Sequence, residues 1–111
     1  MEDEDRTPAL LADIRRLGDD AKLVVGRGRE AFFDPVDRTQ RLAAKAIVID
    51  LNTAVEGLPE SLRQEHPDVA WDELRAMRNY LAHDYANTDY QIVWNALARE
   101  LPMLISQLGL E

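Results

Sequence analysis

The feature that most constrains the fold is the segment from Leu42 to Leu51, which is apolar on almost every side of a helix. Only Lys45 and Asp50 interrupt it, and it is too short to span a bilayer. A helix that is apolar all round must be buried on two sides. We therefore expect a helix over residues 38–55 that packs into its own bundle on one side and against a second subunit on the other.

Other apolar residues recur at spacings of three and four, which predicts amphipathic helices. The first helix follows Thr7, a suitable N-cap with Pro8 after it, and weakens near Gly26. A helix covers about residues 71–82, and the last opens at the N-cap Thr88. The first and last stripes are Leu10, Ile14, Leu17, Ala21 and Val24, and Tyr90, Val93, Trp94, Leu97, Leu101, Leu104 and Leu108.

Three further signals divide the chain between these helices. Asp34-Pro35 breaks it, and Asp37 can cap the helix that follows. Pro102 lies inside the last stripe and should kink or split that helix. No segment alternates as a strand would, so the sequence predicts an all-α antiparallel four-helix bundle with one extra short helix near residues 60–64, as a homodimer. We expect residues 1–6 to be a disordered acidic tail and residues 7–111 a single domain.

Composition narrows the function classes. The chain has no cysteine, which excludes disulfides and thiolate metal sites, and its acids lack histidine partners, so we expect no metal and no cofactor. It has no secretory signal and no membrane span, so we expect a cytoplasmic protein. The formal net charge of −8 opposes tight non-specific RNA binding and favours a basic partner, although a local arginine cluster could still bind phosphate.

The side chains best suited to catalysis are concentrated in the octapeptide from Arg78 to Tyr85, which contains one of only two histidines in the chain. On a helix, Arg78 falls within the apolar face rather than opposite it, so its charge needs either a buried salt bridge or an anionic ligand. Asn79 and His83 lie one above the other, so Asn79 can orient the imidazole or contact the substrate backbone. The apolar face consists of Trp71, Leu74, Met77, Leu81 and Tyr85.

The spacing between Arg78 and His83 is awkward for a joint task. Five residues put them about 140° apart around an ideal helix and roughly 7.5 Å apart along it. Either the helix loosens near His83, or two copies of the chain assemble one site. The second arrangement also supplies two imidazoles, one to act as base and one as acid.

The pattern Arg78, four residues, His83, one residue, Tyr85 resembles the signature of the HEPN superfamily, and most closely its HepT branch. The likeness extends from Leu58 to Leu108, including His66-Pro67, Trp71, Ile92-Val93-Trp94 and Glu100-Leu101-Pro102. That branch often has Gly-Glu-Ala where this chain has Asn52-Thr53-Ala54, so that region receives no catalytic role.

The resemblance implies a metal-independent endoribonuclease toxin with a composite site at a homodimer interface. Arg78 and His83 would be catalytic, Asn79 would support the substrate, and Tyr85 would accept AMP from a nucleotidyltransferase antitoxin that resembles MntA. Simpler roles remain for two of these residues: His83 as a surface histidine near a helix end, and Tyr85 in core packing. The alternative function is a non-catalytic helical dimer that binds or presents substrate to a nucleotidyltransferase.

Overall fold

The computed structural model describes residues 6–83 and 87–111, in which the regular elements are helices and no strand occurs. The long helices are α1 (Arg6–Gly26), α3 (Thr39–Glu56) and α5 (Trp71–His83). A fourth long element consists of α6 (Tyr90–Asn95), a π-helical turn (Ala96–Glu100) and α7 (Leu101–Gln107). The short helices are α2 (Arg29–Phe32) and α4 (Glu60–Glu65).

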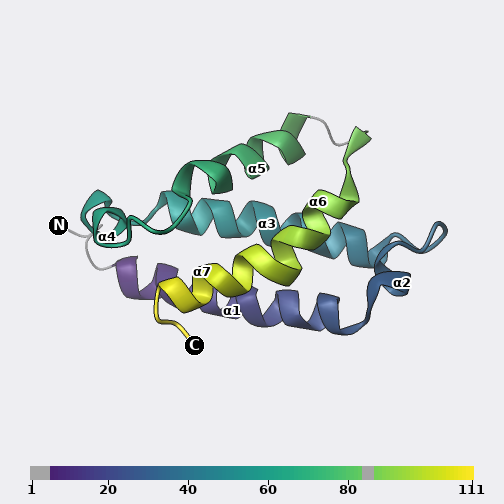
Figure 1. Ribbon diagram of the computed structural model, residues 1–111, viewed down its shortest axis with the longest axis horizontal. Coiled ribbons are helices and arrows are strands. Elements are labelled where there is room, and N and C mark those ends of the chain that lie inside the picture. The colour runs from purple at the N-terminus through teal and green to yellow at the C-terminus, as the bar shows by residue number, and fades with distance from the viewer. Residues whose placement is uncertain (1–5, 84–86) are drawn as a thin grey trace.

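These elements form the predicted all-α bundle (Figure 1). α1 lies along α3, the α6–α7 element crosses both, and α5 packs on α3. The predicted apolar stripes line the interior: Leu10, Ile14, Leu17, Ala21 and Val24 of α1 are buried, as are Val93, Leu97, Leu101 and Leu104. The four long elements and the short α4 are therefore confirmed within the part of the chain that the structure describes.

The sequence did not predict α2, the second short helix. It follows Gly28, whose φ of 92° suits glycine, and four residues are too few to show a helical period. Its Phe32 is fully buried, and the Phe32 ring lies 5.1 Å from that of Trp94. Arg29 stacks over Phe33 and Trp94 beside it, with its guanidinium carbon 4.9 and 5.5 Å from the two rings.

Two predicted caps were wrong. α1 begins at Arg6, so Thr7 lies inside the helix. The N-cap of α6 is Asp89 rather than Thr88, because the Asp89 carboxylate accepts a 3.0 Å hydrogen bond from the backbone N–H of Gln91. The capping role of Asp37 is confirmed, since its carboxylate accepts from the N–H of Thr39, although Arg38 is the N-cap residue itself.

α3 shows the expected contrast between its two sides. Ala44, Ile47, Val48, Leu51 and Val55 are buried in the bundle. On the opposite side Leu42 is 51% exposed and Ile49 is 36% exposed. One side of the apolar segment is thus covered by its own chain, and the other is open in the single chain.

Pro102 splits the last helix, as predicted. The five residues before α7 form a π-helical turn in which Leu101 N–H donates to the carbonyl of Ala96, five residues back. Pro102 then occupies the first turn of α7, directly after the π-helical turn. Each helix in the described ranges is too short or too polar to cross a bilayer.

Candidate active site

The first half of α5 is held by two hydrogen bonds. The indole N–H of Trp71 donates to the carbonyl of His66 at 3.1 Å. The side-chain amide of Asn52, which is 2% exposed, donates to the carbonyl of Leu74 at 2.6 Å. Asn52 therefore ties α3 to α5, a role that the sequence analysis did not assign, although a lone amide in an apolar helix was the available signal.

α5 has two flanks that differ in chemistry. Trp71, Arg75 and Arg78 lie within an arc of about 60°, and we call them the arginine flank. It borders α3, because the Arg75 Nε lies 3.9 Å from a carboxylate oxygen of Glu56, the last residue of that helix.

The other side of α5 carries Glu73, Met77 and Tyr80, within a similar arc, and we call it the tethered flank. It faces the α6–α7 element. The phenol oxygen of Tyr80 accepts a hydrogen bond from the backbone N–H of Asp89, just before α6, at 2.6 Å. This bond closes the connection between α5 and α6, and Tyr80 was missed because nothing in the sequence pairs it with a residue nine positions on.

Arg78 lies on the arginine flank and is half-buried. Among the residues that the structure describes, its side chain makes no hydrogen bond and no ion pair. The intramolecular salt bridge that would have explained a cation in this position is therefore not found in that part of the chain. A half-buried guanidinium without a partner among the described residues is a candidate to bind an anion from outside the chain.

The other predicted site residues are placed less completely. Asn79 is exposed on α5, one turn before His83. His83 is the last residue of α5, and its side chain lies outside the described part of the structure, as does the whole of Tyr85. The structure thus brings Arg78, Asn79 and the His83 backbone onto one helix.

The helix is regular as far as His83. The backbone is therefore not loosened between Arg78 and His83, which was one of the two ways expected to let them share a task. The separation of about 140° and roughly 7.5 Å remains. One copy of α5 directs the two positions to different sides, which favours a site completed by a second chain.

Among the described residues, Glu100 has a raised pKa, and it lies on the side of α5 opposite the arginine flank. Burial raises the pKa of Glu100, at the end of the π-helical turn, and the nearby charge of Glu73 raises it further. These two carboxylates line a cavity of about 100 Å³ together with Leu74 and Met103. No group of three potential metal ligands occurs among the residues with described positions.

Comparison with known proteins connects this helix to a family. The model of the family described as "Ribonuclease HepT-like" matches residues 17–109, most of the chain. The chain belongs to the HepT-like family. The match includes all of α3 and α5, so the half-buried Arg78 and the end of α5 lie inside the HepT-like region.

Three curated relatives carry ribonuclease names. "Putative RNase TTE0752" of Caldanaerobacter subterraneus subsp. tengcongensis is 36% identical over 58 residues, 52% of each chain. "Probable ribonuclease HepT" of Thermococcus cleftensis is 28% identical over 67 residues, 60% of each chain. "Putative RNase MJ1380" of Methanocaldococcus jannaschii is 33% identical over 80 residues, 66% of this chain and 73% of that protein.

The aligned region of this HepT-like chain spans only about half to three fifths of the first two relatives. No solved structure matches the chain significantly.

Proposed function

We propose that the chain is a metal-independent endoribonuclease that works as a homodimer and serves as the toxin of a toxin–antitoxin pair in the cytoplasm. The observation that carries this proposal is the half-buried guanidinium of Arg78, which has no partner among the described residues, on the helix that ends at His83. Membership of the HepT-like family and the ribonuclease names of the relatives support the same reaction class.

The chemistry needs two proton transfers. Cleavage without a metal removes a proton from the ribose 2′-hydroxyl, whose oxygen attacks the adjacent phosphorus, and gives a proton to the departing 5′-oxygen. One imidazole performs one of these tasks at a time, so two copies of His83 would act as base and acid. The two copies of Arg78 would bind the scissile phosphate and stabilise its added negative charge.

The exposed face of α3 supports the homodimer. Leu42, Ala46, Ile49 and Thr53 are exposed and lie within an arc of about 60° on that helix. This apolar strip adjoins the arginine flank of α5, which the contact between Arg75 and Glu56 marks. A dimer formed through the strip would bury apolar surface and bring two arginine flanks to the edge of the interface.

Cleavage of RNA by the purified protein, with and without a chelator, tests the reaction. We expect cleavage to survive the chelator and to leave a 2′,3′-cyclic phosphate. His83→Ala should reduce the rate by about 10²- to 10⁴-fold. His66→Ala is the matched control, because the hydrogen bonds of His66 in the described part of the chain all come from its backbone. Equal rates for the parent and His83→Ala would reject the proposal.

Light scattering tests the dimer. The parent should have twice the mass of a 12.6 kDa chain, whereas Ile49→Glu should be a monomer and cleave poorly. A monomeric parent that cleaves RNA would rule out the composite site.

Control by a nucleotidyltransferase is the remaining part of the proposal. A partner of the MntA type would transfer AMP to Tyr85, and the added phosphodiester would repel substrate phosphate near Arg78. Tyr85→Phe should remain toxic and escape silencing when the partner is co-expressed. Modification of Tyr85→Phe, seen by mass spectrometry, would place the acceptor elsewhere.

A second candidate is a non-catalytic helical dimer that presents substrate to a nucleotidyltransferase. The net charge of −8 favours it, because phosphate binding is weaker on an acidic protein. Absence of cleavage together with stable binding of the transferase would support this candidate.

A further inference from the structure

We propose that the groove between α4 and the start of α5 binds an unpaired nucleobase of the RNA, with a preference for guanine. This inference rests on the proposed ribonuclease function and concerns how the substrate is held beside the reacting phosphate. The groove has a volume of about 550 Å³, within the usual range for small-ligand sites.

The wall of the groove offers an aromatic surface. The indole of Trp71 lines it and is fixed in place by the bond from its N–H to the His66 carbonyl. Single-stranded RNA is commonly bound by bases that stack on aromatic rings. Because that N–H is already used, the ring can offer its face to a base rather than a hydrogen bond to a phosphate.

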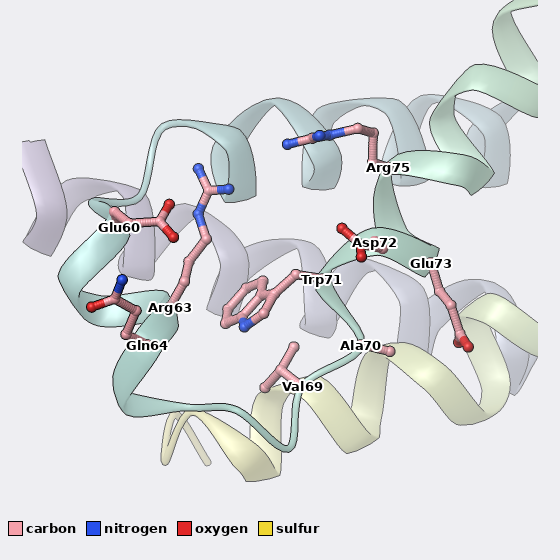
Figure 2. A pocket seen from close by; sticks show the side chains of 9 residues that line it. All are labelled: Glu60, Arg63, Gln64, Val69, Ala70, Trp71, Asp72, Glu73 and Arg75. Carbon is pink, nitrogen blue, oxygen red and sulfur yellow. The ribbon is translucent and has the colours of Figure 1, made fainter.

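Two guanidinium groups lie along one rim (Figure 2). Arg63 donates to the carbonyls of Glu56 and Leu58 at 3.0 and 3.2 Å, which anchors it to the end of α3. Arg75 is 57% exposed, and its only ion pair in the described part of the chain is the 3.9 Å contact with Glu56. Arg75 is therefore available to bind a phosphate.

The arginine flank connects this groove with the proposed reaction site. Arg75 and Arg78 are three residues apart and thus neighbours on the helix surface. Trp71 precedes Arg78 by about 10 Å along the axis. A short single strand whose reacting phosphate lies at Arg78 can bring a neighbouring phosphate to Arg75 and the next base to Trp71.

Acidic and amide groups around the groove determine which base fits. Glu60, Gln64 and Asp72 are exposed at its edge, while Glu73 turns away toward α7 (Figure 2). A carboxylate only accepts hydrogen bonds, and guanine can donate two to one carboxylate from N1–H and the 2-amino group. The same carboxylates oppose non-specific phosphate binding, so stacking and base recognition would supply affinity that a chain of net charge −8 cannot obtain from charge alone.

Tryptophan fluorescence tests the groove. The protein carries His83→Ala to prevent cleavage and is titrated with oligouridylate that contains one guanosine, one inosine or neither. We expect the guanosine oligomer to quench the emission and bind most tightly. Quenching should disappear in Trp71→Phe, where Trp94 remains as an internal reference. Loss of stacking in Trp71→Leu should weaken binding by about 5- to 150-fold.

Surface variants keep the test valid if a substitution at Trp71 impairs folding. Arg75→Gln should weaken binding several-fold and reduce the salt dependence by about 0.7 in slope, whereas the exposed Arg99→Gln should do neither. Glu60→Gln or Asp72→Asn should reduce the preference for guanosine over inosine.

The two proposals fail in distinguishable ways. If cleavage depends on Arg78 and His83 but Arg75→Gln matches Arg99→Gln and no quenching occurs, the groove is not the base site. If neither carboxylate variant changes the preference, base recognition there is rejected. If RNA quenches Trp71 but the parent never cleaves it, the groove stands and the ribonuclease proposal falls.

Discussion

The two flanks of α5 share one helix but differ in whether their side chains find partners within the chain. On the tethered flank, Tyr80 bonds to Asp89, and Glu73 faces Glu100 of the neighbouring element. On the arginine flank, Arg78 makes no bond in the described part of the structure, and Arg75 has one long ion pair. The contrast indicates that one flank stabilises the fold, and it agrees with the proposal that the other flank binds a ligand.

The largest expected effect tests that division directly. Arg78→Ala should lower the rate of RNA cleavage by about 10²- to 10⁴-fold, because it removes the cation that stabilises the reacting phosphate. Its free energy of unfolding should stay the same or rise slightly, since the half-buried charge that is removed has no partner in the described part of the chain. Cleavage kinetics and urea unfolding measure both quantities, with Arg99→Ala as control. A large loss of stability in Arg78→Ala would contradict the division.

Asn52, which packs under α5, should show the reverse pattern, in which a substitution lowers the stability of the fold. Asn52→Ala removes the bond from the Asn52 amide to the Leu74 carbonyl, so unfolding should become easier by about 0.5–1.5 kcal/mol. The exposed Asn95, which accepts a 3.2 Å bond from Gln91, is the matched control and should cost less when replaced by alanine. Equal costs for the two variants, measured by urea unfolding, would show that the tie between α3 and α5 is unimportant.

Tyr80→Phe is a milder change on the tethered flank. It keeps the ring but deletes the phenol oxygen that accepts from Asp89, which should lower stability by about 1 kcal/mol. Tyr90→Phe should leave stability nearly unchanged, because no hydrogen bond to the Tyr90 phenol occurs in the described residues. Thermal unfolding followed by circular dichroism compares the two. An equal loss of stability in both variants would mean that the hydrogen bond between Tyr80 and Asp89 contributes nothing.

The smallest effect concerns Glu100. Its pKa in the folded chain is raised, so the folded state binds this proton more tightly, and stability falls as pH rises from the ordinary carboxyl range through the raised pKa. Glu100→Gln should therefore stabilise the protein at pH 7 by about 0.5 kcal/mol after solvent screening, roughly 2 °C in Tm. The gain should vanish at pH 4, where the parent is protonated. A gain that is equal at both pH values would point to packing instead.

Sequence alone predicted the helices whose apolar stripes are long, such as Leu10 to Val24 and Val93 to Leu104. It failed where a short segment depends on contacts from elsewhere. The helix α2 exists because Phe32 is buried near Trp94, a residue far along the chain. The start of α6 at Asp89 depends likewise on which of two adjacent residues meets the N–H of Gln91.

The candidate site likewise has features that the sequence predicted and features that depend on contacts between distant segments. The position of Arg78 within an apolar face followed from helical spacing. Its half-buried state agrees with that reasoning, as does the absence of a partner among the residues whose positions are described. The hydrogen bonds of Tyr80 with Asp89 and of Asn52 with Leu74 could not be predicted, because each joins segments whose relative placement the sequence does not specify. The roles of His83 and Tyr85 stay predictions.

The π-helical turn before Pro102 has a consequence for how relatives should be aligned. A turn closed by a bond across five residues holds one residue more than an ordinary helical turn. Because the wider turn absorbs this extra residue, deleting one residue between Ala96 and Glu100 would restore the common pitch and leave Leu101 and Leu104 facing the core. A homologue with a regular helix here should therefore show a one-residue gap before its proline and the same apolar stripe after it.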